Sequence, residues 1–384
     1  MNPNGFKMKD KKRILLVFGT RPEAIKMAPL VKAFESESEV FETKVCITAQ
    51  HREMLDQVLS FFEIVPDFDL NLMKPNQSLY SLTAEIITNL KPVLENFNPD
   101  FVFVHGDTTT TMATSIAAFY AGAQICHIEA GLRTFNMKSP FPEEMNRTVT
   151  SVVTNLHFAP TTTSGQNLLN ESKKDSDIIV TGNTVIDALL FSVNKVNTIG
   201  FNDDEVNHLK TILKADKRII LVTGHRRENH GQGFINICEA LRLIALEHPD
   251  CQIVYPVHLN PNVQKPVYNL LKDIENIVLI APLSYPAFVW LMEKAYLIIT
   301  DSGGVQEEAP SLGKPVLVMR DTTERPEAVD AGTVLLVGTD KDIIIKETDM
   351  LLNNKKAYNN MSKLHNPYGD GKACARIVNH IKSL

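Results

Sequence analysis

Short apolar runs alternate with longer segments of helical spacing along almost the whole chain. This alternation is typical of repeated strand–helix–strand units, in which parallel strands are buried on both faces and appear as continuous apolar runs. The pattern occurs once in each half of the chain and predicts an α/β protein with two mainly parallel sheets. A parallel sheet binds ligands beyond the carboxyl ends of its strands, so two such sheets facing each other predict one central cleft.

The expected elements follow this alternation. In the first half we expect strands at Arg13–Phe18, Phe41–Thr48, Phe101–Val104, Ala123–Ile128, His157–Ala159 and Asp177–Val180, and helices at Glu23–Glu37, His51–Phe61, Leu79–Asn96 and Thr109–Ala121. In the second half we expect strands at Ile219–Thr223, Ile253–Pro256, Ile277–Ile280, Leu297–Ile299, Val316–Val318 and Val334–Leu336, and helices at Phe234–His248, Pro261–Leu271, Tyr285–Lys294 and Val305–Leu312. No long linker separates the halves, so the join is expected between Asn183 and about Asn197.

Composition excludes several classes of protein. Hydrophobic residues make up 44% of the 384 residues and charged residues 22%, which matches globular proteins and not disordered, collagenous or coiled-coil chains. The formal net charge of −6 gives no overall electrostatic attraction for nucleic acid or an anionic membrane. Neither is therefore expected as a partner.

Three features predict a cytoplasmic protein. No stretch approaches the roughly 18 apolar residues that a membrane helix needs. The apolar run behind the basic N-terminus ends at Phe18, which is too short for a signal-peptide core, and residues 1–9 are expected to form a loose leader. The 5 cysteines form no C-x-x-C pair, which favours a reducing compartment.

Charged side chains follow the strands of the first half at their carboxyl ends. Arg21 and Lys26 lie at the start of a helix, where cations are disfavoured unless an anion binds nearby; a surface salt bridge is the simpler alternative. Asp107 follows the strand Phe101–Val104 and suits either a crevice or a helix N-cap. Glu129 ends a buried strand, where a carboxylate needs a partner or a function.

Two further groups carry charge. Glu143 and Arg147 lie four residues apart, so an ion pair on a helix surface explains them as well as a site does. His225, Arg226 and Arg227 follow a strand in the second half, and the glycines behind them precede a helix. Such a loop suits an oxyanion or phosphate.

The strongest single pattern is Asp-Ser-Gly-Gly at residues 301–304, between a strand and a helix. Glycines let backbone N–H groups approach a pyrophosphate with no Cβ in the way, although a capped helix with a flexible entry is the simpler alternative. Glu308, expected in the first helical turn, suits sugar hydroxyls, and Arg325 adds a cation to the same rim. Together the strand ends predict a cleft for an anionic sugar nucleotide.

Other ligands are not indicated by the sequence. The Walker spacing G-x-x-x-x-G-K-[ST] is absent. His, Cys and carboxylate residues show no metal-ligand spacing, and the cations can neutralise a diphosphate directly. We therefore expect neither a metal nor a cofactor.

As an ordered set, the motifs resemble those of the non-hydrolysing UDP-N-acetylglucosamine 2-epimerases. These motifs are VFGTRPEAIKMAPL, QHREMLDQVL, VHGDTTTTMA, HIEAGLRT, PFPEEMNR, VTGNTVIDAL, TGHRREN, YPVHLNPNV and DSGGVQEEAPSLGKPVLVMRDTTERPEAV. The resemblance runs from about Arg13 to Lys382 and implies two Rossmann-like domains of the GT-B type with the active site between them. It also implies a homodimer, a first domain at residues 10–185, a second at 186–369, and a C-terminal helix at 370–384 that packs back onto the first domain.

The resemblance implies roles for particular residues. The catalytic set would be Lys26, Asp107, Glu129, Glu143 and His225. The substrate-binding set would be Arg21, Lys26, Asp107, Glu129, Arg147, His225, Phe288, Ser302, Gly303, Gly304, Glu308 and Arg325, with Phe288 near the base. Gln50, His51 and His258 match residues that bind a second, activating UDP-N-acetylglucosamine in many bacterial members.

The implied reaction inverts carbon 2 of UDP-N-acetylglucosamine and gives UDP-N-acetylmannosamine, a precursor of bacterial surface polysaccharides. No carbonyl activates the hydrogen at carbon 2, so loss of UDP must accompany its removal and leave 2-acetamidoglucal. Return of a proton to the opposite face and re-addition of UDP complete the inversion. Asp107, Glu129 and Glu143 are the candidate acid and base groups, and the sequence does not assign them individually.

Three other functions are compatible with parts of this pattern. A retaining glycosyltransferase shares the fold and the donor but needs an acceptor groove. A hydrolysing epimerase releases free N-acetylmannosamine. A non-catalytic sugar-nucleotide sensor would keep Ser302–Gly304 but would have no use for both Lys26 and Glu129.

Overall fold

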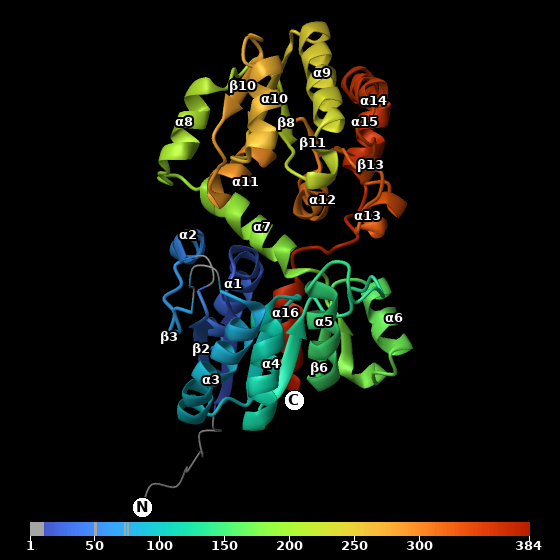
Figure 1. Cartoon of the computed structure of the whole chain (residues 1–384). Coiled ribbons are helices and arrows are strands. Elements are labelled where there is room, and N and C mark those ends of the chain that lie inside the picture. Colours follow the sequence, from blue (N-terminus) through green and yellow to red (C-terminus); the bar gives the residue numbers. More distant parts are fainter. Residues whose placement is uncertain (1–10, 50–51, 73, 75–76) are drawn as a thin grey trace, which may run out of the picture. The chain divides into compact units, whose positions relative to one another are not determined.

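The computed structural model describes residues 11–49, 52–72, 74 and 77–384. The leader expected at residues 1–9 lies outside this range. The chain forms two compact units: unit 1 comprises Met1–Ala188 with Gly371–Leu384, and unit 2 comprises Leu189–Asp370. Each unit contains one parallel sheet with helices on both faces (Figure 1).

Unit 1 is built on a seven-stranded sheet of order β3-β2-β1-β4-β5-β6-β7. All neighbouring strands are parallel. The strands are β1 (Lys12–Phe18), β2 (Phe41–Ile47), β3 (Phe68–Asp69), β4 (Phe101–His105), β5 (Gln124–Ile128), β6 (Leu156–Ala159) and β7 (Ile178–Val180). The strand order reverses between β1 and β4, which is where doubly wound sheets bind their ligands.

The helices of unit 1 pack apolar side chains against this sheet. They are α1 (Arg21–Glu35), α2 (Arg52–Phe61), α3 (Leu79–Phe97), α4 (Thr109–Ala121), α5 (Glu143–Val153), α6 (Thr162–Asn170) and α16 (Ala373–Ser383), and the division between units falls inside α7 (Thr184–Val196). The carboxylate of Asp187 accepts the N–H groups of Ala373 and Cys374 at 3.1 and 2.9 Å, which ties the start of α16 to α7. The last helix of the chain therefore belongs to the first unit.

Unit 2 repeats the arrangement with a six-stranded parallel sheet of order β10-β9-β8-β11-β12-β13. Its strands are β8 (Arg218–Thr223), β9 (Cys251–Pro256), β10 (Ile277–Ile280), β11 (Leu297–Thr300), β12 (Val316–Val318) and β13 (Val334–Leu336). Its helices are α8 (Asp204–Ile212), α9 (Gln232–Glu247), α10 (Pro261–Leu271), α11 (Tyr285–Lys294), α12 (Gly303–Glu308), α13 (Pro326–Asp330), α14 (Lys341–Asn353) and α15 (Lys355–Ser362). Here the order reverses between β8 and β11.

The prediction of two Rossmann-like parallel sheets is confirmed, and the expected strands agree with the observed ones to within two residues. The two-residue edge strand β3 was not predicted, because so short a segment carries no period. The helix expected over Val305–Leu312 begins earlier, as α12, and continues as a 3-10 turn at Ala309–Leu312. No helix in the described part of the chain is both long and apolar enough to span a membrane.

Candidate active site

Lys26 and Glu129 form a buried ion pair in unit 1. Lys26 lies on the second turn of α1, and its ammonium group donates a hydrogen bond to the Glu129 carboxylate. Glu129 follows β5 in the left-handed backbone region, with φ of 63°, a strained conformation that is common at functional sites. Asn183 Nδ2 donates to the same carboxylate at 2.8 Å, and His105 Nε2 lies 3.8 Å from it. Two hydrogen bonds, from Lys26 and Asn183, therefore hold this carboxylate, and His105 lies beside it.

Asp107 pairs with Arg147, which projects from α5. Arg147 Nη2 donates to Asp107 Oδ2 at 2.6 Å, and Asn146 Nδ2 donates to the Asp107 carbonyl at 2.9 Å. The alternative role of Asp107 as a helix cap is wrong, because Thr108 caps α4 by accepting the Thr111 N–H. The ion pair considered between Glu143 and Arg147 is also not what forms, since Arg147 faces Asp107 and, at 3.5 Å, Glu144.

Electrostatics connect these groups into one cluster. Burial raises the pKa of Asp107, and the charges of Glu129 and Glu143 raise it further, while Arg147 and Lys26 oppose the shift. Burial lowers the pKa of His105 to about 3, so this imidazole is neutral at physiological pH. Unit 1 thus brings together three carboxylates and two cations, an arrangement suited to proton transfer beside an anionic ligand.

Beneath this cluster lies Glu23, a carboxylate that is 2% exposed. It accepts the Gly19 and Thr20 N–H groups at 3.1 and 2.8 Å and the Thr108 hydroxyl at 2.7 Å. These bonds join the turn after β1, which leads into Arg21 at the start of α1, to the turn after β4, which carries Asp107. Glu23 therefore holds the two turns of the switch point in register.

In unit 2, the loop after β8 is held by a buried aspartate after β11. Asp301 is fully buried, and its Oδ2 accepts the N–H groups of His225 and Arg226 at 2.9 and 2.8 Å. Asn229 Nδ2 adds a third, longer hydrogen bond at 3.3 Å. The His225 ring lies over Asp301, with Nδ1 3.5 Å from Oδ1, and its side chain is 44% exposed.

The Ser302–Gly304 segment has space beside its main chain. A Cβ added at Gly303 would approach only the Arg226 guanidinium, at 3.8 Å. At Gly304 it would meet the Glu308 carboxylate at 3.5 Å, which places Glu308 beside the loop although it lies in the last turn of α12 and not the first. This segment therefore leaves room for a ligand against the main chain.

The remaining candidate residues lie on several elements. Arg325 Nε forms an ion pair with the buried Glu307, and Phe288 is half-buried on α11. His258, after β9, stacks its ring on that of His225 with centroids 5.3 Å apart. Gln50 and His51, expected in the activator site, lie outside the described residues.

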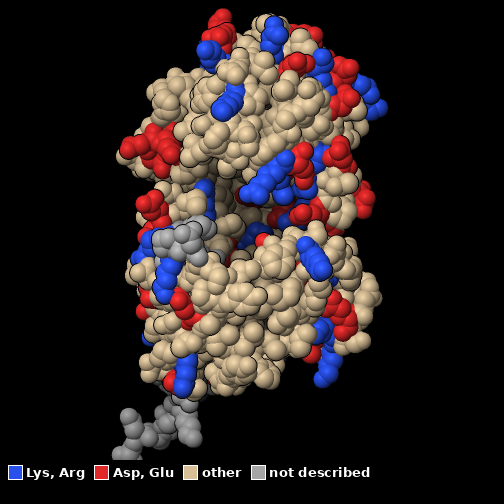
Figure 2. Space-filling view, in the orientation of Figure 1, with Lys and Arg blue, Asp and Glu red and all other residues tan. Residues whose placement is uncertain are grey.

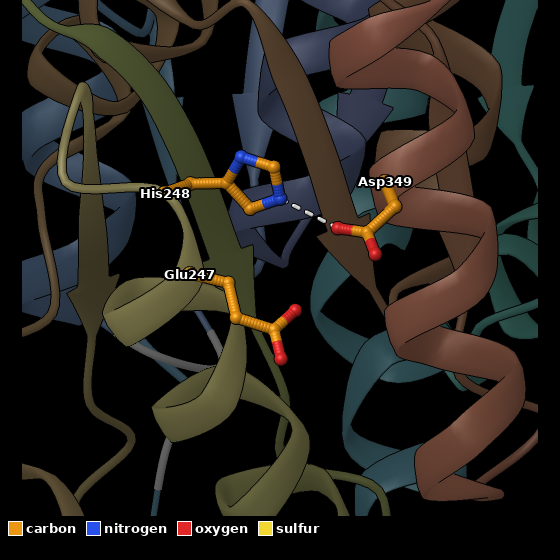
Figure 3. A group of neighbouring side chains, drawn as sticks. All are labelled: Glu247, His248 and Asp349. Atoms are coloured by element: carbon orange, nitrogen blue, oxygen red, sulfur yellow. Dashed lines mark hydrogen bonds and ion pairs between the residues drawn. The ribbon is translucent and has the colours of Figure 1, made fainter.

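One group of three possible metal ligands lies away from these strand ends, at Glu247, His248 and Asp349 (Figure 3). His248 Nε2 is already hydrogen-bonded to Asp349 Oδ1 at 2.5 Å, and Glu247 is exposed. This pair links the end of α9 to α14, so a contact between helices accounts for it.

Sequence reasoning missed three of the residues that build the site, namely Glu23, Asn183 and Asp301. Asp301 carried a usable signal, because it is a charged residue directly after a buried strand. Glu23 resembled an ordinary first-turn carboxylate, and Asn183 an ordinary loop amide. Only their contacts distinguish them.

Comparison with known proteins assigns the chain to a family. A model of the UDP-N-acetylglucosamine 2-epimerase family matches residues 32–382. The chain belongs to the UDP-N-acetylglucosamine 2-epimerase family. A UDP-N-acetylglucosamine 2-epimerase of Escherichia coli K12 is 60% identical over 371 residues, which cover 97% of this chain and 98% of the relative.

Solved structures of the family have the same fold. The structure of UDP-GlcNAc 2-epimerase from Neisseria meningitidis bound to UDP-GlcNAc is 53% identical, with a TM-score of 0.87 over 97% of this chain and 100% of that one. A putative UDP-N-acetylglucosamine 2-epimerase from Listeria monocytogenes is 49% identical, with a TM-score of 0.90 over 97% and 96% of the two chains. The chain is thus an epimerase-family enzyme of the GT-B fold, as the sequence motifs predicted.

Proposed function

We propose that this enzyme interconverts UDP-N-acetylglucosamine and UDP-N-acetylmannosamine by eliminating UDP and adding it back. The observation that carries the proposal is the cluster of carboxylates and cations at the switch point of unit 1, in a chain of this family. The relative from Escherichia coli bears the name of this activity, and the Neisseria structure contains UDP-GlcNAc. The product would serve the synthesis of bacterial surface polysaccharides.

The chemistry follows from the low acidity of the hydrogen at carbon 2, which is removed only when UDP leaves. A carboxylate removes the proton from carbon 2, the C1–C2 double bond forms, and the C1–O bond breaks with its electron pair leaving on UDP. A second acid then delivers a proton to the opposite face of carbon 2, and UDP re-adds to carbon 1. Burial raises the pKa of Asp107, which favours uptake of a proton by this carboxylate. Glu129, paired with Lys26, and Glu143 are the other candidates.

Unit 2 would bind the UDP part of the substrate. The open backbone at Ser302–Gly304 suits the diphosphate, and the Glu308 carboxylate beside it suits ribose hydroxyls. His225 and Arg325 would add positive charge, and Phe288 would pack near the base. We propose that Arg21 and Arg147 of unit 1 also contribute to substrate binding.

Incubation of the purified protein with UDP-N-acetylglucosamine in deuterated water tests the proposal. Proton NMR should detect UDP-N-acetylmannosamine carrying deuterium at carbon 2, because the proton delivered to the new face comes from a group that exchanges with solvent. Product that retains the original hydrogen would refute elimination. Free N-acetylmannosamine with UDP would indicate a hydrolysing enzyme, and absence of turnover despite UDP binding would indicate a sensor.

We further propose a homodimer that forms through α3 and α4 and operates in the cytoplasm. Helix α4 contains no charged residue, and Tyr80, Phe119 and Tyr120 are 91%, 59% and 77% exposed on these two helices. Figure 2 presents few charged side chains over α4. Such a surface is typical of an interface between subunits. The 5 cysteines are buried free thiols, in keeping with a reducing compartment.

Activation by a second substrate molecule remains a proposal for this chain, resting on Gln50, His51 and His258. If it operates, the initial rate should depend sigmoidally on UDP-N-acetylglucosamine, and UDP-N-acetylmannosamine alone should react slowly until a trace of its epimer is added. Hyperbolic kinetics in both directions would exclude it.

A further inference from the structure

The two carboxylate oxygens of Asp301 differ in their hydrogen bonding. Oδ2 accepts the main-chain N–H groups of His225 and Arg226 and the amide of Asn229. Oδ1 is fully buried and makes no hydrogen bond to the part of the chain that the structure describes. A buried carboxylate oxygen without a donor is costly, so a donor is expected close by.

The only side-chain nitrogen that the described structure pairs with this oxygen is Nδ1 of His225, at 3.5 Å. The same loop backbone that is anchored on Oδ2 places the ring over Oδ1, so a small ring rotation closes the hydrogen bond. His258 stacks against the ring at 5.3 Å with an interplanar angle of 19°, which restricts rotation out of that orientation. His258 is itself oriented, because its Nδ1 accepts the Asn260 N–H at 3.1 Å.

We infer that Asp301 is a positioning residue that accepts the Nδ1 proton of His225 and so presents Nε2 of this imidazole to the substrate. The partner of one ring nitrogen sets the proton on the other, and a neutral His225 in this pair exposes an unprotonated Nε2. Protonation of Nε2 gives an imidazolium that donates to an anionic diphosphate oxygen, with its charge balanced by Asp301. The inference rests on the proposed function only for the contribution of His225 to turnover.

The surroundings of His225 set the direction of its titration. Burial lowers the pKa of His225, Asp301 opposes this, and His258 and Arg226 lower it further. Loss of the Asp301 charge should therefore lower the pKa of His225 further, because Asp301 is the contribution that raises it while burial, His258 and Arg226 all lower it.

The variant Asp301→Asn distinguishes a role in orienting the His225 ring from a role in holding the loop after β8. The amide oxygen of Asn can still accept the N–H groups of His225 and Arg226, while its NH₂ group faces Nδ1 and forces that nitrogen to become the acceptor. The neutral ring then carries its proton on Nε2, and the geometry of the loop is kept. Thermal unfolding with and without UDP checks that the variant is folded and binds nucleotide.

The first experiment reads the ring directly and does not depend on turnover. Two-bond ¹H–¹⁵N NMR of histidine-labelled protein, with His225→Gln used to assign the signal, should find the Nδ1–H form in the native protein. It should find the Nε2–H form and a lower pKa in Asp301→Asn. An Nε2–H form in the native protein, or identical spectra in both, would overturn the inference even if epimerase activity is absent.

The second experiment uses kinetics. Asp301→Asn should lower kcat by about 10²-fold with a change of KM below about threefold. In a His225→Gln background the same substitution should change kcat by less than about threefold, because its effect passes through the missing imidazole. Equal losses in both backgrounds would show that Asp301 only supports the fold, and a native protein without activity would refute the proposed function instead.

Discussion

Replacing Glu23 is the sharpest test of how the switch point of unit 1 is held together. Its carboxylate is 2% exposed and accepts two main-chain N–H groups and one hydroxyl at 2.7–3.1 Å. In Glu23→Ala these three donors lose their acceptor inside the protein. At about 1–3 kcal/mol for each unsatisfied buried group the three losses would amount to about 3–9 kcal/mol. Because the hydrogen bonds from Thr20 and Thr108 are only partly buried, water can partly replace the carboxylate, and the free energy of unfolding should fall by an amount at the lower end of this range, about 3–5 kcal/mol.

Glu23→Gln should lose much less, about 1 kcal/mol, because the amide oxygen still accepts the Gly19 and Thr20 N–H groups and the NH₂ can donate to the Thr108 hydroxyl. Glu35→Ala is the matched control, since Glu35 ends the same helix on the surface, where its side chain is 45% exposed beside Lys32. Exposed pairs of this kind contribute less than about 0.5 kcal/mol.

Urea unfolding followed by circular dichroism measures these differences. Hydrogen exchange of peptides from β1 and α4 assigns them to unit 1, while the fluorescence of Trp290, the single tryptophan, reports on unit 2. Glu23→Ala should accelerate exchange in β1 and α4 and leave the Trp290 emission unchanged without denaturant. A loss below about 0.5 kcal/mol in Glu23→Ala, equal to the control, would refute the argument.

Three further outcomes are expected. Burial lowers the pKa of His157 to about 3 from its ordinary 6.5, so between these values the unfolded state binds a proton that the folded state does not. The free energy of unfolding should therefore fall as the pH drops from about 6.5 towards 4. In His157→Asn, acid unfolding should show this pH dependence reduced by about 1.4 kcal/mol per pH unit. Gly131→Ala should destabilise far more than Gly122→Ala in thermal unfolding, because both have positive φ but only at Gly131 would the Cβ meet the Ser164 carbonyl oxygen, at 2.2 Å. Gly303→Val should fold normally yet lose the stabilisation by UDP, which is about 2.7 kcal/mol at a hundredfold excess over Kd.

Each of these has a result that would contradict it. An unchanged acid slope in His157→Asn would mean that this imidazole titrates alike in both states. Equal melting temperatures for the two glycine variants would show that the backbone around Gly131 can shift to accommodate the Cβ without loss of stability. A full thermal shift with UDP in Gly303→Val would show that the diphosphate does not bind at this loop.

Apart from β3, the strands were predictable because local patterns specify them, as were helices such as α1, α3, α4 and α9, whereas α5, α6, α7, α8, α13, α14 and α15 were not predicted. Strands buried on both faces appear as unbroken apolar runs such as Phe101–Val104, and glycines mark turns such as Gly122, which adopts a φ of 78° after α4. The motifs also identified the family, because they are specific to it as an ordered set along the chain. These properties depend on residues close together in the sequence, so they can be predicted without a structure.

The partners of the charged residues were decided only by the tertiary structure. Arg147 lies four residues from Glu143, yet it pairs with Asp107, 40 residues away, because α5 packs against α4, which begins just after Asp107. Lys26 and Glu129 meet because β1 and β5 both flank β4 in the sheet, an order that no local pattern encodes. The sequence by itself determined most of the strands, the longer apolar-faced helices and the residues that follow the strand ends. The strand order decided which carboxylate meets which cation, because burial and pairing arise from residues far apart in the chain.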